Sequence, residues 1–249
     1  MKIIALKLYR DGEMKEEFAL GGSLSPEELD TTKVYPSSLQ NYLIDTGSEV
    51  ILVDTGLPVE TPDFKKEKDQ KLFVGYKIDD YHQALQHAGY KPEDVTKILV
   101  THKHPDHTGE LRYFPNAKIY LSETEAEAMG LAGENIIPVS FKDGPFENFD
   151  KSEKITDDII MIPTPGHTKG NSAFVLKEDH LYYLFHGDVT YTDEALRRSA
   201  LSVVFEDKTA AMETLLKVRE FVENHDTIYL STHTPEGPEA LAGKKIFEF

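Results

Sequence analysis

The hydrophobic residues of this chain fall into short apolar runs, several of them rich in Val and Ile, which are separated by polar segments. Apolar runs of about four to eight residues are typical of β-strands. The pattern predicts strands over residues 2–9, 39–45, 50–54, 97–101, 117–121, 155–162, 172–177, 181–186 and 227–230. Thr46-Gly47-Ser48 lies between the second and third of these strands and predicts a hairpin turn.

Helices are indicated where apolar residues recur at the helical period. Residues 209–224 direct Leu215, Phe221 and other apolar side chains toward one face, which predicts a long amphipathic helix. Residues 79–88 predict a shorter helix that ends at Gly89. Helices are therefore expected to alternate with the strands.

Two further helix starts are indicated by polar residues. In Ser122-Glu123-Thr124-Glu125, Ser122 is expected to cap a helix, and the Glu125 side chain is expected to reach back to the cap. Residues 108–111 are expected to open another helix with Asp106 near its cap position.

Two segments lack a clear period. Residues 11–36 are polar and rich in Gly, Ser and Pro, and we predict a loop there. Residues 57–77 contain a charged run and predict a long loop or lid, a kind of segment that often has a function. Because no linker or repeat divides the chain, we expect residues 1–249 to form a single α/β domain.

Composition and charge narrow the function classes. The chain has 249 residues, of which 39% are hydrophobic and 29% charged, as in an ordinary globular protein. It has 27 Lys and Arg residues but 44 Asp and Glu residues, and the resulting net charge of −17 disfavours nucleic acid as a partner. The lack of Cys excludes disulfides and thiolate sites. With no signal-like or membrane-spanning run, we expect a cytoplasmic protein that does not bind membranes.

One six-residue stretch, His102-Lys103-His104-Pro105-Asp106-His107, stands out because it holds four potential metal ligands at a predicted strand-to-helix turn. Imidazole and carboxylate together suit zinc and other first-row divalent ions. The turn is too crowded to supply every ligand of one tetrahedral ion. We therefore interpret it as half of a two-metal site.

Three isolated residues share the placement of this motif. His167, Asp188 and His233 each follow the end of a predicted strand. Side chains at strand ends can converge on one edge of a sheet, where rigid elements hold them. A lone histidine is more often an ordinary core or surface residue, so the prediction depends on the whole set.

This ordered set resembles the metallo-β-lactamase superfamily: His-x-His-x-Asp-His, then Pro-Gly-His, then Gly-Asp, then a late His. The resemblance implies an αββα sandwich with a dinuclear site on one edge. It implies two divalent ions, zinc or alternatively iron, manganese or cobalt. By motif position, one ion is bound by His102, His104 and His167, and the other by Asp106, His107 and His233, with Asp188 bridging them.

Such a centre suits hydrolysis. A metal lowers the pKa of bound water to about 7, so a bridging hydroxide can attack a carbonyl or phosphoryl group at neutral pH. The resemblance suggests that Asp106 also passes a proton to the leaving group. It favours a role for Asp54 in accepting the N–H of a ligand imidazole, the alternative being a turn Asp that bonds its own backbone.

Two stretches more specifically resemble the N-acyl homoserine lactone hydrolases. In Gly187-Asp188-Val189-Thr190-Tyr191, the resemblance implies that Tyr191 donates its hydroxyl to the scissile carbonyl, the alternative being a packed aromatic side chain. The segment from Leu57 to Asp94 resembles the lid of that family and the helix after it, so Phe73 and Tyr76 are expected to contact an acyl chain unless they pack on their own helix.

These features predict a hydrolase for a small-molecule substrate, most simply a lactone, acting as a monomer or homodimer. Another ester, a thioester as in glyoxalase II, or a phosphodiester is the alternative. A diiron redox protein is disfavoured because it would prefer a carboxylate at His104 and requires a flavin domain. A metal-binding scaffold without activity is the remaining class.

Overall fold

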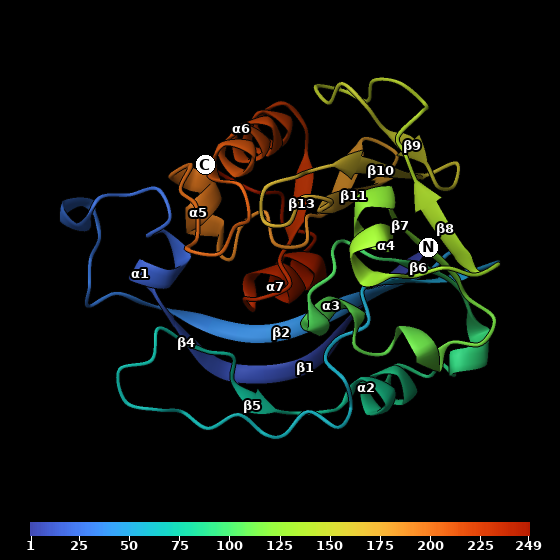
Figure 1. The fold of residues 1–249 in the computed structure, drawn as a ribbon, viewed down its shortest axis with the longest axis horizontal. Coiled ribbons are helices and arrows are strands. Elements are labelled where there is room, and N and C mark those ends of the chain that lie inside the picture. The colour runs from blue at the N-terminus through green and yellow to red at the C-terminus, as the bar shows by residue number, and fades with distance from the viewer.

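Two β-sheets pack face to face, and helices cover both outer faces (Figure 1). The computed structural model describes residues 1–249. The strand order is β4-β1-β2-β3-β6-β7-β8 in the first sheet, with β5 also paired to β1, and β13-β12-β11-β10-β9 in the second. The αββα sandwich predicted from the sequence is confirmed.

The elements have the following bounds. The strands are β1 Lys2–Lys15, β2 Val34–Asp45, β3 Val50–Val53, β4 Leu72–Phe73, β5 Tyr76–Lys77, β6 Val95–Leu99, β7 Lys118–Ser122, β8 Ile136–Val139, β9 Glu153–Lys154, β10 Ile159–Pro163, β11 Ser172–Glu178, β12 Leu181–Phe185 and β13 Thr227–Leu230. The helices are α1 Glu16–Ala19, α2 Tyr81–His87, α3 Pro105–Thr108, α4 Glu123–Met129, α5 Asp193–Arg197, α6 Lys208–Asn224 and α7 Glu236–Gly243.

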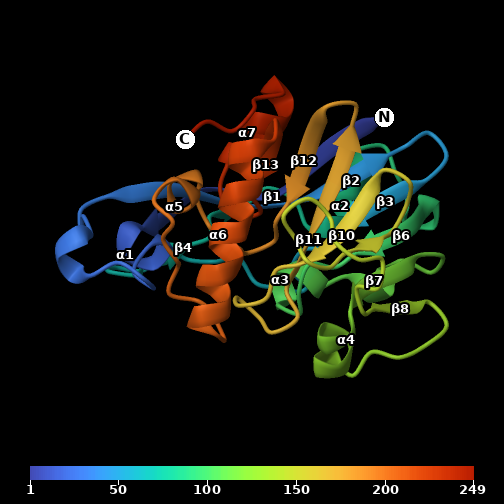
Figure 2. The same ribbon diagram turned by 90° about the horizontal axis from the view of Figure 1, so that it is seen from above.

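The layers follow from the alternation of side chains along the strands. On β2, Tyr42 and Ile44 point into the core between the two sheets, whereas Leu39 and Leu43 point outward to the layer that includes α2. On the far side, apolar residues of α6 pack against the second sheet. Helix α1 lies at one end of the molecule and β8 at the other (Figures 1 and 2).

The strand directions gather loops at one edge. Strands β3, β6 and β7 run parallel, as do β12 and β13, so their carboxyl ends lie at matching sides of each sheet. The candidate ligands follow the ends of β6, β10, β12 and β13. None of the helices has the length and apolar character needed to span a membrane.

Pairing between strands corrects the predicted loops. β1 continues to Lys15 and β2 begins at Val34, because these polar segments pair with each other, for example Glu13 with Pro36. The predicted loop over residues 11–36 is therefore partly wrong. Within the predicted lid, β4 and β5 pair with β1. Such pairing comes from distant segments and leaves no apolar period in the local sequence.

Two helix starts also differ from the predictions. Helix α3 begins at Pro105, and His104 occupies the cap position expected for Asp106, because Pro is favoured in the first turn of a helix. Ser122 caps α4 as predicted and accepts a hydrogen bond from the Glu125 N–H at 3.2 Å. The Glu125 side chain does not complete the capping box and bonds two other loops.

Candidate metal centre

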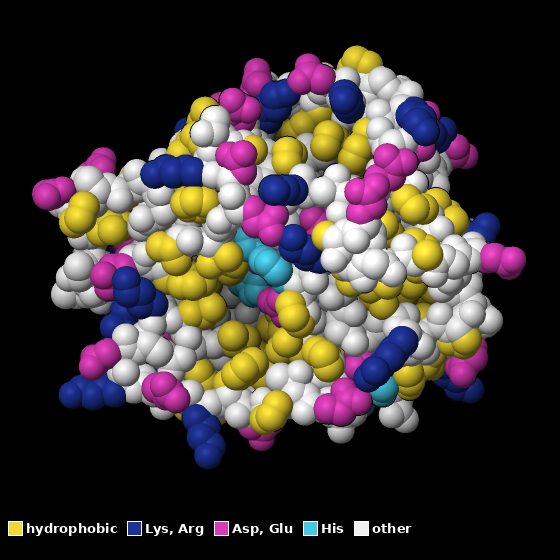
Figure 3. Space-filling model, in the orientation of Figure 1, with side chains coloured by type: hydrophobic (Ala, Val, Ile, Leu, Met, Phe, Trp, Pro, Cys, Tyr) yellow, Lys and Arg dark blue, Asp and Glu magenta, His cyan; other side chains and the backbone are white.

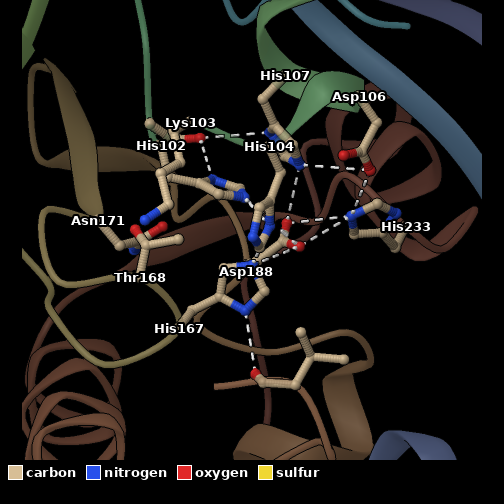
Figure 4. Close-up of polar contacts among 12 residues, drawn as sticks. His102, Lys103, His104, Asp106, His107, His167, Thr168, Asn171, Asp188 and His233 are labelled. Carbon is tan, nitrogen blue, oxygen red and sulfur yellow. Dashed lines mark hydrogen bonds and ion pairs between the residues drawn. The ribbon is translucent and has the colours of Figure 1, made fainter. Parts of the chain in front are cut away.

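The loops at the sheet edge bring all the predicted metal ligands together (Figure 4). They form two groups, in each of which the potential ligand atoms lie within 4.8 Å of one another. The first cluster is His102, His104, His167 and Asp188, and the second cluster is Asp106, His107 and His233.

The histidine nitrogens of the first cluster converge. His104 Nδ1 lies 3.0 Å from His102 Nε2 and 2.9 Å from His167 Nε2. Zinc–nitrogen bonds of about 2.0–2.1 Å in a tetrahedron would place neighbouring donor atoms about 3.3 Å apart. The donor set and its spacing therefore fit one divalent ion.

Asp188 lies between the two clusters. Its Oδ2 is 3.3 Å from His167 Nε2, while its Oδ1 is 3.2 Å from His107 Nε2 and 3.1 Å from His233 Nε2. Oδ2 also lies 3.1 Å from His233 Nε2, so the carboxylate contacts histidines of both clusters. Asp188 Oδ1 and His107 Nε2 are buried without a hydrogen-bond partner, which is costly unless a cation satisfies them.

Burial and charge shift the pKa values in the two clusters differently. Burial lowers the pKa of His102 and of His167. Burial alone would also lower the pKa of His107 and His233, but the Asp188 carboxylate beside them raises both above the usual value. These histidines in turn hold the pKa of Asp188 well below its usual range despite its burial.

Asp54 supports the ligands from behind. Its Oδ2 accepts a hydrogen bond from His107 Nδ1 at 2.7 Å and one from Thr101 Oγ1 at 2.8 Å. Thr101 Oγ1 lies 3.0 Å from His102 Nδ1, so the same carboxylate reaches a histidine of each cluster. Asp54 has a φ of 62°, a conformation that is uncommon outside Gly. Its side chain does not serve its own backbone turn.

Thr101 was not identified from the sequence as a site residue. It ends an apolar run just before the histidine motif, and only its two bonds to Asp54 reveal its role. Its neighbour Gly187 has a φ of 57°, and a Cβ there would lie 2.8 Å from Thr101 Cβ. The Gly of the Gly-Asp motif therefore permits both the backbone conformation and the close approach.

Tyr191 lies beside both clusters. Its ring stacks on that of His233 with centroids 4.8 Å apart, and its centroid is 6.1 Å from that of His167. Burial and the Asp188 and Asp106 carboxylates raise the pKa of Tyr191 well above its usual value, so its hydroxyl is protonated at neutral pH. Phe18, which the sequence did not single out, packs edge-on against this ring at 5.3 Å.

The centre opens to solvent on the side of Asp106. The Asp106 side chain is 28% exposed, and its Oδ2 lies 3.6 Å from His233 Nε2 and 3.7 Å from His107 Nε2. Figure 3 shows the histidines in a hollow near the middle of this face, with hydrophobic side chains beside and below them.

The two predicted lid residues lie against each other. Phe73 is buried and packs edge-on against Tyr76 with centroids 5.1 Å apart, while Tyr76 is 57% exposed. Leu72, on the opposite side of β4, packs against a group of buried hydrophobic residues that includes Tyr191. Contact of Phe73 or Tyr76 with a substrate stays a prediction.

Comparison with known proteins agrees with this geometry. Residues 36–233 match the family model described as the metallo-beta-lactamase superfamily. The chain belongs to this superfamily. Among curated relatives, an N-acyl homoserine lactonase from a Bacillus species is 25% identical over 246 residues, which cover 94% of this chain and 93% of the relative. A probable metallo-hydrolase of Mycobacterium tuberculosis is 25% identical over 174 residues, which cover 60% and 56%.

Solved structures show that this superfamily member shares its fold with lactonases. An N-acyl homoserine lactone hydrolase, with the product N-hexanoyl-L-homoserine at its catalytic metal centre, matches with a TM-score of 0.70 and 20% identity over 96% of this chain and 95% of that one. A dizinc quorum-quenching lactonase matches with a TM-score of 0.66 and 17% identity over 94% and 87%.

Proposed function

We propose that this superfamily member is a dinuclear metal-dependent lactonase whose substrates are N-acyl homoserine lactones. The observation that carries the proposal is the resemblance to N-acyl homoserine lactonases, which spans nearly the full length of both proteins. The position of Tyr191 beside both clusters supports it, because a hydroxyl donor there would stabilise the negative charge that develops on the carbonyl oxygen during ring opening.

The two clusters are the proposed metal sites. His102, His104 and His167 would hold one ion, and Asp106, His107 and His233 the other, with Asp188 shared between them. Zinc suits these nitrogen and oxygen donors, and iron, manganese or cobalt would also be accommodated. When bound, the ions supply a nucleophile from water at neutral pH and polarise the substrate carbonyl.

Two side chains carry out the remaining steps of the hydrolysis. Asp106 is the most exposed carboxylate of the centre, so it can accept the proton of the attacking water and return it to the ring oxygen as the C–O bond of the lactone breaks. Tyr191, kept protonated by its surroundings, donates its hydroxyl to the carbonyl oxygen as negative charge develops there. The single product is the ring-opened hydroxy acid.

The proposal extends to the whole chain. Apolar residues of both sheets form one shared core, so we propose that residues 1–249 act as a single domain. The hydrolysis of another ester, a thioester or a phosphodiester is the alternative activity, since the same centre could attack these bonds.

A substrate panel tests the choice. Purified protein loaded with Zn²⁺ would be offered N-acyl homoserine lactones of graded chain length, a glutathione thioester and a phosphodiester, with acid release or chromophore release as the readout. We expect kcat/KM for at least one lactone to exceed that for the other classes by about tenfold or more, equivalent to about 1.4 kcal/mol. Faster hydrolysis of the thioester or the phosphodiester would contradict the proposal, and chelated protein serves as the blank.

A further inference from the structure

A buried carboxylate on α4 connects two of the loops that carry the metal ligands. Glu125 is 1% exposed. Its Oε2 accepts a hydrogen bond from the Lys103 N–H at 2.9 Å. Its Oε1 accepts bonds from Thr168 Oγ1 at 2.7 Å and from the Gly170 N–H at 2.9 Å. One oxygen therefore serves the loop after β6, and the other serves the loop after β10.

These loops supply every histidine of the first cluster. Lys103 stands between His102 and His104, and Thr168 follows His167 directly. A carboxylate that accepts one hydrogen bond from the first loop and two from the second fixes the separation of the loops. The position of the histidine donor atoms depends on that separation.

The packing around the carboxylate leaves it little freedom. A Cβ at Gly170 would lie 2.7 Å from Glu125 Oε1 and 2.5 Å from Ser122 Oγ, so the loop can approach α4 this closely only with Gly at that position. Ser122, the cap of α4, also donates its hydroxyl to the Gly170 carbonyl at 2.7 Å. The cap of the helix and its third residue thus hold the same loop.

The second cluster has separate supports. His107 bonds to Asp54 through its ring, and the His107 carbonyl accepts a hydrogen bond from the Thr55 N–H at 2.7 Å. The His233 carbonyl accepts one from the Ser38 N–H at 3.0 Å. Glu125 has no bond to either residue.

We propose that Glu125 is a positioning residue of the first cluster, holding the His102–His104 segment and the His167 loop at the spacing that binds a divalent ion. This inference rests on the proposed metal sites and is independent of the substrate. The groups that hold a ligand in place typically change metal affinity by about 10–100-fold when they are mutated.

The test measures Zn²⁺ affinity, by competition with a chromophoric chelator, in two backgrounds. His233→Ala removes a ligand of the second cluster and leaves the first cluster, whereas His167→Ala does the reverse. Glu125→Gln, which turns an amide NH₂ toward a backbone N–H, would be added to each. We expect affinity to fall about 10–100-fold in the His233→Ala background and to change less than about threefold in the His167→Ala background.

Two further variants separate positioning from a loss of folding. Glu127→Gln alters an exposed carboxylate on the same helix and should leave affinity unchanged in both backgrounds. Thr168→Val removes one of the three donors without changing the carboxylate, and should weaken only the first cluster, by less than Glu125→Gln does. If Glu125→Gln does not fold, Thr168→Val decides the question by the same comparison.

The outcomes are distinct. Equal losses in both backgrounds, or no loss in either, would overturn the positioning role of Glu125. Wild-type protein that binds no Zn²⁺ would overturn the metal centre and this inference with it. Wild-type protein that binds two ions but opens no lactone would contradict the proposed function, while the affinity measurements would still decide the role of Glu125.

Discussion

The two clusters are built from similar ligands but differ in charge and support. In the first cluster, the buried histidines His102 and His167 have lowered pKa values, so each imidazole is uncharged at neutral pH and has one nitrogen without a proton. In the second cluster, the pKa values of His107 and His233 are raised by nearby carboxylates. An ion entering the second cluster must therefore displace protons, and its affinity should fall as the pH falls.

The residues that hold the two clusters in place also differ. The loops of the first cluster are joined by one buried side chain on α4, that of Glu125. Asp54 bonds His107 of the second cluster directly and reaches His102 of the first only through Thr101. The second cluster also has backbone bonds from neighbouring segments, such as that from Ser38 to the His233 carbonyl. The comparison suggests that the first cluster can be weakened alone, whereas a change at Asp188 should affect both.

The largest effect is expected from the residue that the clusters share. Asp188→Ala removes an oxygen from each cluster, so both bound metal and lactone hydrolysis should be lost. Elemental analysis of the purified variant measures the metal, and circular dichroism verifies the fold. A variant that retains two ions would show that the clusters do not depend on a shared carboxylate.

The next effect separates chemistry from metal binding. Tyr191→Phe removes the proposed donor and keeps the ring that stacks on His233, so kcat on lactones should fall about 10²-fold while both ions stay bound. Steady-state kinetics with metal analysis measures this. Phe18→Leu changes the neighbouring packing without removing a donor and serves as the matched control. Unchanged turnover in Tyr191→Phe would exclude the role.

A smaller effect is expected from Asp54, which supports the second cluster. Asp54→Asn replaces the carboxylate that accepts from His107 Nδ1, and Zn²⁺ affinity in the His167→Ala background should fall about 10–100-fold. Thr101→Ser keeps the hydroxyl between Asp54 and His102 and should retain affinity. Equal affinity in Asp54→Asn and its parent would show that His107 needs no such partner.

The smallest effect concerns a pair of carboxylates behind the His233 loop. Glu236 Oε2 accepts hydrogen bonds from the Asp193 N–H at 2.8 Å and from Thr234 Oγ1 at 3.1 Å. Burial and the Glu236 charge raise the pKa of Asp193 to about 7. Because the folded state binds this proton more tightly than the unfolded chain, the stabilisation is complete only below about pH 4 and is lost progressively as the pH rises from there to about 7.

Asp193→Asn imitates the protonated side chain. Its melting temperature should exceed that of wild type slightly at pH 5, where the unfolded Asp is already ionised, and by a few degrees at pH 8.5, since about 1 kcal/mol corresponds to about 2–4 °C in a chain of this size. Asp226→Asn, at an exposed carboxylate, is the control and should follow wild type at both pH values. Parallel melting curves for Asp193→Asn and wild type would contradict the raised pKa.

Short-range patterns in the sequence determined much of the fold. The predicted strand over residues 50–54 closely matches β3, Val50–Val53, and the strand over 227–230 is β13, because apolar residues fill these short segments. The amphipathic pattern over residues 209–224 likewise gave α6, whose apolar face packs on the second sheet. Buried elements of this kind carry their own period.

The residue types at strand ends also predicted the candidate metal ligands. Metal binding explains the imidazoles and carboxylates at four separate turns together, and the structure gathers them within the two clusters. This inference needed the spacing of a known family as well as the chemistry, because any single histidine, such as His167, has an ordinary alternative reading.

Only the tertiary structure decided which residues hold these ligands in place. The sequence placed Glu125 in a local capping box, yet its carboxylate bonds Lys103 and Gly170, which are distant along the chain. Thr101 likewise has no local signal and becomes a link only when β3 and β6 lie side by side. A hydrogen bond between remote segments depends on their relative position in space, and the local order of residues does not encode it.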